Sequence, residues 1–529
     1  MPNTGGASGT ARADETVPVG RTPPVLPPGA TSPHLDPRMP QDRLRSWVVT
    51  LAVTALAALV RFWDLGLASD DGAPVFDEKH YVPQAWDIAR SWFNPVLGGI
   101  ESNPGYGLVV HPPLAKKIEA LGEMVFGYTP LGWRFMAALF GSAVVVFTML
   151  LARRLSQSRM IALFAGTIAL CDGVLLVIGR FGMLDVFILL FIVMAAWTLA
   201  GDMRDVHQRF HDAYVEGEIN PRLGFRWWRF ATGVLLGCAL AVKWSGLYYI
   251  AFFGLLSSFY DLWLRHRYGV KNPVRETLLK DVPSALASIV LIPAVLYVWS
   301  WRAWFASETA VYRHALSDGT IANSDWPGLA KLPEALAGWF YYHLSVLRFH
   351  SELTSSSGHS HPWDSKPWSW LVASRPILYF SANGDDSRRM IYLFGTPAIW
   401  WLTVPVLLWA VWAWVTRKDR RVILPLVGFA AGFLPWLAAF DRQMYFFYAA
   451  PLAPFTIVLL ALALGELSKR GTYLERVGKY VGPITSGQLC VVVYLAVVIG
   501  MFLYFSPILY GFSIPESYYN QLMWLPSWK

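Results

Sequence analysis

The sequence predicts an all-α polytopic membrane protein, and two features of its 529 residues support this prediction. Hydrophobic residues make up 55% of the chain and charged residues only 15%, whereas soluble domains average about 25% charged residues. The apolar residues also gather in stretches near the ~20 residues that a helix needs to cross a bilayer. This composition excludes a soluble domain, a wholly disordered chain and a small disulfide-rich scaffold.

A polar N-terminal tail, residues 1–45, precedes the apolar stretches. It is rich in Pro, Gly, Ser and Thr and holds few large apolar side chains, so we expect it to be disordered and cytoplasmic. It also lacks the apolar core of a signal peptide. Residues 46–529 then form one transmembrane domain with two long loops, 65–131 and 302–393. The expected spans, eleven in number, are 46–64, 132–151, 160–178, 183–200, 230–247, 248–264, 284–301, 394–416, 422–439, 446–464 and 485–506.

Basic residues predict the orientation of these spans. The five loops on the side of the tail carry 21 Lys and Arg in about 75 residues, and the opposite side carries 15 in more than twice that length. Because cytoplasmic loops are enriched in Lys and Arg, we expect a plasma-membrane protein with its N-terminus inside and both long loops and its C-terminus outside. The basic residues lie in short blocks between spans, so the net charge of +8 does not indicate nucleic-acid binding. The cysteines lie in apolar stretches, and we expect no disulfide.

Unusual polar residues gather on the predicted outer face. Ionisable groups near membrane depth are costly and are therefore candidates for function. The candidates lie after the first span, at the outer ends of later spans and in the second long loop. They are Asp77, Glu78, Arg134, Arg180, Asp185, Lys243, His361, Lys366 and Arg442.

Carboxylates and cations together suit group transfer from a lipid-linked phosphate. Cations hold the phosphate and stabilise the charge that develops on it as its bond breaks. A carboxylate accepts the proton of an incoming hydroxyl. The sequence contains no Walker A motif and no Rossmann glycine pattern. An activated lipid is therefore a more plausible donor than a nucleotide.

Structural interpretations of the same residues stay open. The Asp77-Glu78 pair can be an ordinary solvated acidic pair of a loop. Arg134 and Lys243 can extend along their helices to the headgroups. Arg180 and Asp185, which flank one outer turn, can form a purely structural ion pair.

The sequence gives weaker support to a metal site and to two non-enzymatic functions. His359 and His361 have a spacing that metal ligands use, but no tight Cys, His or Asp cluster accompanies them. Transporters place charges near the bilayer midplane, often in repeated halves, whereas this chain shows no repeat and its candidate charges favour one surface. An assembly scaffold does not explain why acids and bases share one face.

The ordered series of outer motifs resembles the protein O-mannosyltransferases, and most closely their bacterial, actinobacterial-type members. The likeness runs from about residue 46 to the C-terminus. It implies the GT-C fold and an inverting transfer of mannose from polyprenyl-phosphate-mannose to Ser/Thr hydroxyls of secreted proteins. The motifs are Asp77-Glu78, His111-Pro112-Pro113-Leu114-Ala115-Lys116, Lys243-Trp244-Ser245-Gly246, His361-Pro362-Trp363, Lys366-Pro367-Trp368-Ser369-Trp370, Gly395-Thr396-Pro397 with Trp400-Trp401, and Arg442-Gln443-Met444-Tyr445.

The resemblance also implies roles for single residues. Asp77 corresponds to the general base, and Glu78 helps to position the acceptor or the sugar. Arg134 corresponds to an arginine associated with the donor phosphate. Further candidates for binding the donor phosphate or lipid are Lys243, Arg442, His361, Lys366 and Arg180.

The implied chemistry needs one carboxylate base and no covalent glycosyl intermediate, unlike the paired carboxylates of glycosidases. We expect no cofactor and no metal requirement, because the polyprenyl-phosphate-mannose is a co-substrate. The expected partners are that donor, a secreted acceptor protein, the bilayer and the secretion translocon. The 302–393 loop is too short for the β-trefoil domain of eukaryotic members. The main rival is a GT-C enzyme that uses the same class of donor to modify a lipid or a wall polysaccharide.

Overall fold

The structure is a computed structural model, and it describes most of the chain after the N-terminal tail. Of the predicted 1–45 tail, residues 1–41 lie outside the described residues, whereas Arg43 already begins the first helix. The described residues are 42–66, 71–101, 109–359, 361–384, 386–474 and 484–529.

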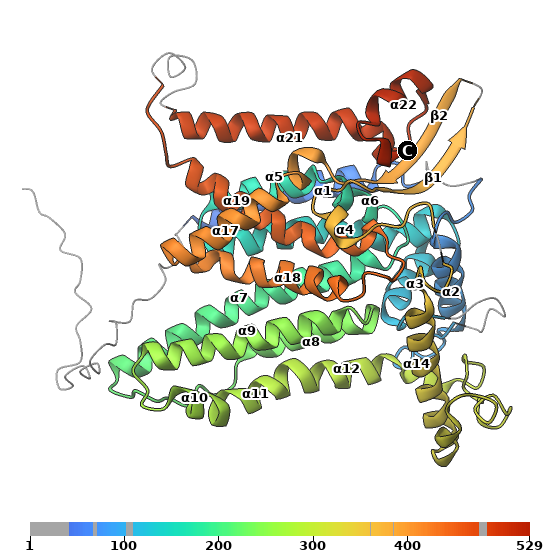
Figure 1. The fold of residues 1–529 in the computed structure, drawn as a ribbon. Coiled ribbons are helices and arrows are strands. Elements are labelled where there is room, and N and C mark those ends of the chain that lie inside the picture. Colours follow the sequence, from blue (N-terminus) through green and yellow to red (C-terminus); the bar gives the residue numbers. More distant parts are fainter. Residues whose placement is uncertain (1–41, 67–70, 102–108, 360, 385, 475–483) are drawn as a thin grey trace, which may run out of the picture.

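Long apolar helices form a bundle with roughly parallel axes (Figure 1). Within the described residues, nine helices are long and apolar enough to cross a membrane, and they make this a multi-pass membrane protein. One of them, Pro273–Ser300, is treated below. The others are α1 (Arg43–Phe62), α4 (Pro130–Ser156), α7 (Asp185–Val215), α9 (Gly246–Arg267), α16 (Pro397–Trp400) with α17 (Thr403–Arg417), η4 (Arg420–Val422) with α18 (Ile423–Leu437), η5 (Phe446–Leu452) with α19 (Ala453–Leu467), and α21 (Ser486–Tyr510).

Two shorter apolar helices complete the bundle, α5 (Arg159–Leu170) and α8 (Trp227–Val242), and a short helix α6 (Gly173–Ile178) follows α5. Each of the eleven predicted spans overlaps one of the long or shorter apolar helices. Because α5 and α8 are shorter than the ~20 residues of a full crossing, the number eleven stays a prediction.

The Pro273–Ser300 helix contains two widened turns, and each ends two residues before a proline. Its segments are α10 (Pro273–Glu276), η1 (Thr277–Asp281), α11 (Val282–Leu286), η2 (Ala287–Leu291) and α12 (Ile292–Ser300), with η1 and η2 in π-helical geometry. Pro283 and Pro293 have no backbone N–H, and their rings crowd the carbonyl four residues earlier. The π turns accommodate these carbonyls without ending the helix.

Loop elements gather at one end of the bundle, to the right in Figure 1. They come from the two long loops and the C-terminal segment, which the sequence analysis assigns to one side of the membrane. The elements are α2 (Glu78–Ser91), α3 (Leu114–Phe126), α13 (Arg302–Ala306), η3 (Pro327–Lys331), α14 (Glu334–Glu352), α15 (Pro367–Trp370), β1 (Ile377–Asn383), β2 (Ser387–Leu393), β3 (Ile514–Pro515), α22 (Glu516–Leu522) and η6 (Pro526–Trp528).

The predicted helical class is confirmed, and one small sheet accompanies the helices. Its antiparallel strands lie in the order β1-β2-β3, with Ile377 opposite Leu393. The register shifts between Leu378 and Phe380, so Tyr379 is an extra residue that bulges from the ladder. The hairpin lies at the loop end of the bundle, near the first long loop.

The core is centred on α7 and α19, whose apolar windows are the most buried of the membrane-spanning candidates. Helix α7 packs against α4, α8 and α9. Since α7 is held on several sides, its first residue, Asp185, has a rigid position at the loop end of the bundle.

A buried ionic network closes the opposite end. Arg226 donates two hydrogen bonds to Asp261, at 2.7 and 2.8 Å, and also holds both carboxylate oxygens of Asp202. Arg265 binds both oxygens of Asp281, at 2.5 and 2.9 Å. Every carboxylate oxygen of these three aspartates therefore accepts from a guanidinium.

Candidate active site

Asp77 occupies the N-cap position of α2, but its side chain does not cap the helix. An N-cap aspartate usually accepts a hydrogen bond from the first helical N–H groups. Here its backbone has helical angles (φ −72°, ψ −9°) and no side-chain cap bond forms. Among the described residues, no hydrogen bond reaches this carboxylate. The Asp77 carboxylate, which is predicted to act as the base, therefore does not cap the helix.

The residue before Asp77 has a strained backbone. Phe76 has a φ of +53°, a left-handed conformation that costs a bulky residue about 1–3 kcal/mol. Its ring stacks on Tyr379 with a centroid separation of 4.4 Å and an interplanar angle of 16°. It also meets the edge of Phe447 at 6.4 Å. The β1 bulge supplies Tyr379, so the hairpin helps to hold the backbone that orients Asp77.

Burial dominates the electrostatics of Asp77. It raises the pKa of the carboxyl to about 6, while Lys243 and His80 oppose the rise and Asp185 adds to it. These contributions place Lys243 and Asp185 in the immediate electrostatic surroundings of Asp77. A carboxylate with this pKa is still ionised at pH 7 and is more basic than an ordinary aspartate.

Glu78 and Arg134 form a buried pair behind Asp77. The Arg134 guanidinium donates two hydrogen bonds of 2.7 Å to the two oxygens of Glu78, and both side chains are at most 1% exposed. The backbone N–H groups of Val75 and Gly182 donate to the same carboxylate, at 3.1 and 2.8 Å. Arg134 also donates to the Leu65 carbonyl at 2.6 Å. The pair joins α2, α4 and the turn before α7, and neither residue lines the cavity described next.

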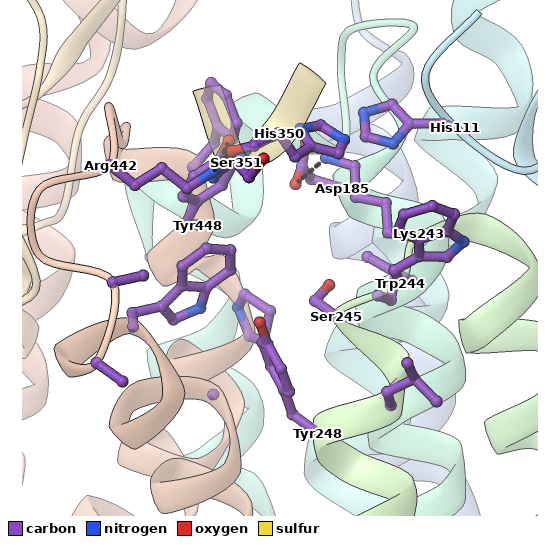
Figure 2. Close-up of a pocket in the computed structure, with 18 of the residues that line it drawn as sticks. His111, Asp185, Lys243, Trp244, Ser245, Tyr248, His350, Ser351, Arg442 and Tyr448 are labelled. Carbon is purple, nitrogen blue, oxygen red and sulfur yellow. Dashed lines mark hydrogen bonds and ion pairs between the residues drawn. The ribbon is translucent and has the colours of Figure 1, made fainter. Parts of the chain in front are cut away.

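A cavity of about 540 Å³ lies at the loop end of the bundle. Asp77 is not among its lining residues, but Lys243 and Asp185, whose charges act on the Asp77 carboxyl, line it. Its walls come from the first turn of α7, the α8–α9 turn, α14, the segment after α18, and η5. Figure 2 shows Lys243 and Arg442 on opposite walls. Lower down, the lining becomes apolar and includes Leu247 and Phe440, which are 51% and 62% exposed on the outside of the bundle. The cavity therefore joins a charged upper part to an apolar exit between α9 and α18.

Lys243 forms an ion pair with Asp185 across the cavity wall. Its ammonium lies 2.8 Å from Asp185 Oδ1, and both side chains line the cavity. The alternative that Asp185 pairs with Arg180 is therefore wrong. The α7 and α8–α9 segments bring together two residues that lie 58 positions apart in the chain.

Arg442 supplies a second cation to the cavity. Its guanidinium donates to His350 Nδ1 at 3.0 Å, to the Tyr448 hydroxyl at 3.2 Å and to the His350 carbonyl at 3.3 Å. Burial, together with the charges of Arg442 and Lys243, lowers the pKa of His350 to about 4. His350 is thus neutral at pH 7 and can accept from Arg442. No carboxylate pairs with Arg442 within the described part of the chain.

Arg180 lies away from the cavity. It donates to the carbonyls of Arg61 and Trp63 at 3.0 and 2.6 Å, and its guanidinium lies over the Tyr510 ring at 4.6 Å. These contacts fasten the end of α1 to the turn before α7. Its assignment to the donor site stays a prediction.

His361 and Lys366 lie in the segment that supports Arg442. Lys366 forms a 3.0 Å ion pair with Asp364 and donates to the Arg442 carbonyl at 2.8 Å. The His361 ring packs against Tyr445 at 5.1 Å. Neither side chain lines the cavity, so their direct contact with a donor also stays a prediction.

Two cavity histidines received no role in the sequence analysis. His350 lies on α14, and His111 belongs to a motif that supported only the resemblance. Their rings lie 6.0 Å apart, and burial lowers the pKa of His111 well below its usual value. The spacing of His343 and His350, two helical turns apart, could have indicated one shared face. Trp244 indeed contacts both rings, at 5.8 and 6.4 Å.

Comparison with known proteins identifies the family. Residues 51–303 match the model for dolichyl-phosphate-mannose-protein mannosyltransferase, and residues 335–528 match that for the C-terminal four-transmembrane region of protein O-mannosyltransferase. The polyprenol-phosphate-mannose–protein mannosyltransferase of Corynebacterium glutamicum is 61% identical over 511 residues, which cover 94% of this chain and 96% of that one. The protein of the same name from Mycobacterium tuberculosis is 42% identical over 518 residues, 96% of each chain.

Solved structures show the same fold at much lower identity. The Saccharomyces cerevisiae Pmt1-Pmt2 complex bound to the sugar donor matches with a TM-score of 0.68 and 16% identity over 93% of each chain. ArnT from Cupriavidus metallidurans bound to undecaprenyl phosphate matches with a TM-score of 0.51 and 16% identity, over 88% of this chain and 77% of that one. The fold is that of the GT-C glycosyltransferases, as the motifs predicted. With two family models and full-length relatives in agreement, this chain belongs to the protein O-mannosyltransferase family.

Proposed function

We propose that this protein transfers mannose, with inversion, from polyprenyl-phosphate-mannose to Ser/Thr hydroxyls of secreted proteins at the extracytoplasmic face. One observation supports the proposal most strongly: an aspartate without a hydrogen-bond partner among the described residues lies within electrostatic reach of Lys243 and Asp185, which line a cavity that combines cations with apolar residues. The 61% identity to a polyprenol-phosphate-mannose–protein mannosyltransferase favours this donor and a protein acceptor over a lipid or polysaccharide acceptor.

The cavity accommodates each part of such a donor. The phosphate lies between Lys243 and Arg442, whose charges stabilise the phosphate as it leaves. The isoprenoid follows the apolar lining past Leu247 and Phe440 toward the membrane. In this arrangement, the tail stays in the bilayer while the sugar reaches the charged end.

Asp77 performs the proton transfer. The acceptor oxygen bonds to C1 of mannose as the bond between C1 and the phosphate oxygen breaks, and the hydroxyl proton passes to Asp77. The products are an O-mannosylated side chain and polyprenyl phosphate. A single displacement inverts C1, and phosphate is a good leaving group, so no second carboxylate has to act as a nucleophile or an acid.

Three further parts belong to the same proposal. The N-terminus lies in the cytosol and the catalytic end outside, beside the secretion translocon from which acceptor chains emerge. Glu78 and Arg134 position the Asp77 loop. In the proposed reaction, no metal takes part.

A reconstituted assay tests the function. The full chain in lipid vesicles receives labelled polyprenyl-phosphate-mannose and a Ser/Thr-rich, Pro-containing peptide, with and without EDTA. We expect label in the peptide under both conditions, and Asp77→Asn should abolish most transfer while still binding the donor. Label that enters glycolipid but never peptide would overturn the acceptor assignment, and full activity of the Asp77→Asn variant would overturn the base.

A further inference from the structure

We infer that Asp185 binds hydroxyl groups of the donor sugar through its free carboxylate oxygen and so determines recognition of the sugar. This inference rests on the proposed function and deepens it, because it assigns the sugar subsite within the same cavity. Three observations carry it: an unpartnered buried oxygen, its place beside Asp77, and the chemistry of the groups that face it.

The first observation is the state of the carboxylate. Asp185 is 5% exposed. Its Oδ1 accepts the Lys243 ammonium at 2.8 Å, whereas Oδ2 is buried without a hydrogen-bond partner among the described residues. A buried charged oxygen that lacks a donor destabilises the protein unless a ligand supplies one. The oxygen therefore has capacity for hydrogen bonds that the protein itself leaves unfilled.

The second observation is position. Asp185 lines the cavity, and Figure 2 shows it at the upper end with Lys243. Its negative charge raises the pKa of Asp77, and the charge of Lys243 lowers it. The Tyr379 hydroxyl is likewise buried without a partner in the described residues, and after burial the charges of Asp185 and Asp77 are the largest causes of its raised pKa. Asp185 and Tyr379 thus both lie in the electrostatic surroundings of Asp77, which C1 faces in the proposed reaction.

The third observation is chemical. An ionised carboxylate only accepts hydrogen bonds, so Oδ2 repels the donor phosphate and attracts a ligand that is rich in O–H groups. The acceptor side chain brings one hydroxyl, which Asp77 must engage, whereas the sugar brings several. Lys243 has three N–H donors and uses one on Asp185. The remaining donors can reach the phosphate, so this lysine joins the sugar subsite to the phosphate subsite.

Binding of two ligands that differ only in the sugar tests the inference. The affinities of polyprenyl-phosphate-mannose and of polyprenyl phosphate are measured on the full chain in vesicles, for the wild type and for Asp185→Asn. We expect the substitution to lower the affinity for the mannosylated ligand by about 10- to 100-fold, the range for the loss of a hydrogen bond to a charged group. The affinity for polyprenyl phosphate should change by no more than about threefold, because that ligand has no sugar.

Two further variants separate sugar binding from charge neutralisation. Asp185→Asn leaves Lys243 without its partner, so the double variant Asp185→Asn/Lys243→Gln removes both charges. If Asp185 only neutralises Lys243, the double variant recovers the preference for the mannosylated ligand and the inference fails. A preference that stays lost supports it. Asp87→Asn is the matched control, because Asp87 pairs with Arg90 on the exposed side of α2, outside the cavity.

The outcomes also separate this inference from the proposed function. A wild type that neither prefers the mannosylated ligand nor transfers mannose contradicts the proposed function. A wild type that does both, with an unchanged ligand preference in Asp185→Asn, contradicts only the role of Asp185. If Asp185→Asn lowers the affinities for both ligands equally, Asp185 has a general structural role, and the inference is overturned.

Discussion

The two charged ends of the bundle differ in how completely their charges are paired. At one end, all six carboxylate oxygens of Asp202, Asp261 and Asp281 accept from arginines. At the loop end, Asp77 accepts no hydrogen bond from the described residues and Asp185 uses only one of its two oxygens. Both ends are buried and rich in charge, so burial and charge alone do not distinguish a structural network from a site.

The difference indicates which charges serve the fold and which await a ligand. A buried polar group without a partner costs about 1–3 kcal/mol, and a fold keeps such groups only where another advantage offsets the cost. The fully paired end leaves nothing for a ligand to bind. The incompletely paired end, with the strained Phe76 beside it, has the character of a substrate site. Substitutions at the two ends should therefore change different properties.

The largest effect should follow from Asp77→Asn. The amide cannot accept the acceptor proton, so kcat should fall by about 10²- to 10⁴-fold, while donor affinity and thermal stability stay close to wild type. Initial rates of peptide mannosylation and a thermal unfolding curve measure both properties. If the variant loses stability in proportion to activity, Asp77 stabilises the fold, and the two ends of the bundle do not differ in the proposed way.

At the paired end, Arg226→Met should change stability instead. It leaves the carboxylates of Asp202 and Asp261 buried without this partner, which should lower the free energy of unfolding by about 3–5 kcal/mol. The rate per folded molecule should stay near wild type, because the site lies at the opposite end. Thermal unfolding in detergent and active-site titration report these quantities. An unchanged midpoint together with a reduced rate would place this network in the function.

Arg442→Gln should weaken donor binding. The variant loses charged hydrogen bonds to the phosphate worth about 1.5–3 kcal/mol, so the KM for the donor and the inhibition constant of polyprenyl phosphate should both rise by about 10- to 100-fold. Arg348→Gln is the control, because Arg348 lies on α14 near His350, the partner of Arg442, but is half exposed and paired with Asp325 and Glu352. Equal effects of the two substitutions would remove Arg442 from the phosphate site.

Substitution of Tyr379, whose ring stacks on Phe76, should have a smaller effect. Tyr379→Ala removes the ring that supports the strained Phe76, and kcat should fall about tenfold if ~1.4 kcal/mol of the backbone strain is released. Tyr379→Phe keeps the stacked ring and should retain most of this activity. The ratio of the two kcat values is the measurement. Equal losses in both variants would transfer the role from the ring to the hydroxyl.

The smallest expected effect is that of pH on the transfer rate near neutral pH. Asp77 must be deprotonated to act as a base, and its pKa is about 6. The rate should therefore be nearly constant above pH 7, and below pH 6 it should fall by about tenfold per pH unit. The Asp77→Asn variant should lack this acidic limb. A wild-type profile that stays flat down to pH 4 would contradict the raised pKa.

The sequence was sufficient to predict the membrane fold, and it singled out several candidate residues that lie at the loop end of the bundle. Apolar stretches of near-bilayer length located the helices, and the acidic motif after the first span identified Asp77. Lys243 and Arg442 were candidates because ionisable groups near membrane depth are costly. These signals are local in the sequence, so they can be recognised without knowing how the helices pack.

Pairings between distant segments could not be predicted. Nothing local assigns Lys243 to Asp185 rather than Arg180 to Asp185, and the choice depends on how α7 meets the α8–α9 turn. The Glu78–Arg134 pair joins residues 56 positions apart. The β-hairpin was missed because its strands carry short apolar runs without alternation and lie within a long loop.

A structure of the full chain with polyprenyl-phosphate-mannose bound tests the central claim most directly. We predict the phosphate between Lys243 and Arg442, the sugar hydroxyls at the free oxygen of Asp185, and C1 of mannose facing Asp77. A donor whose phosphate lies outside this cavity, with Asp77 turned away from the sugar, would contradict the account.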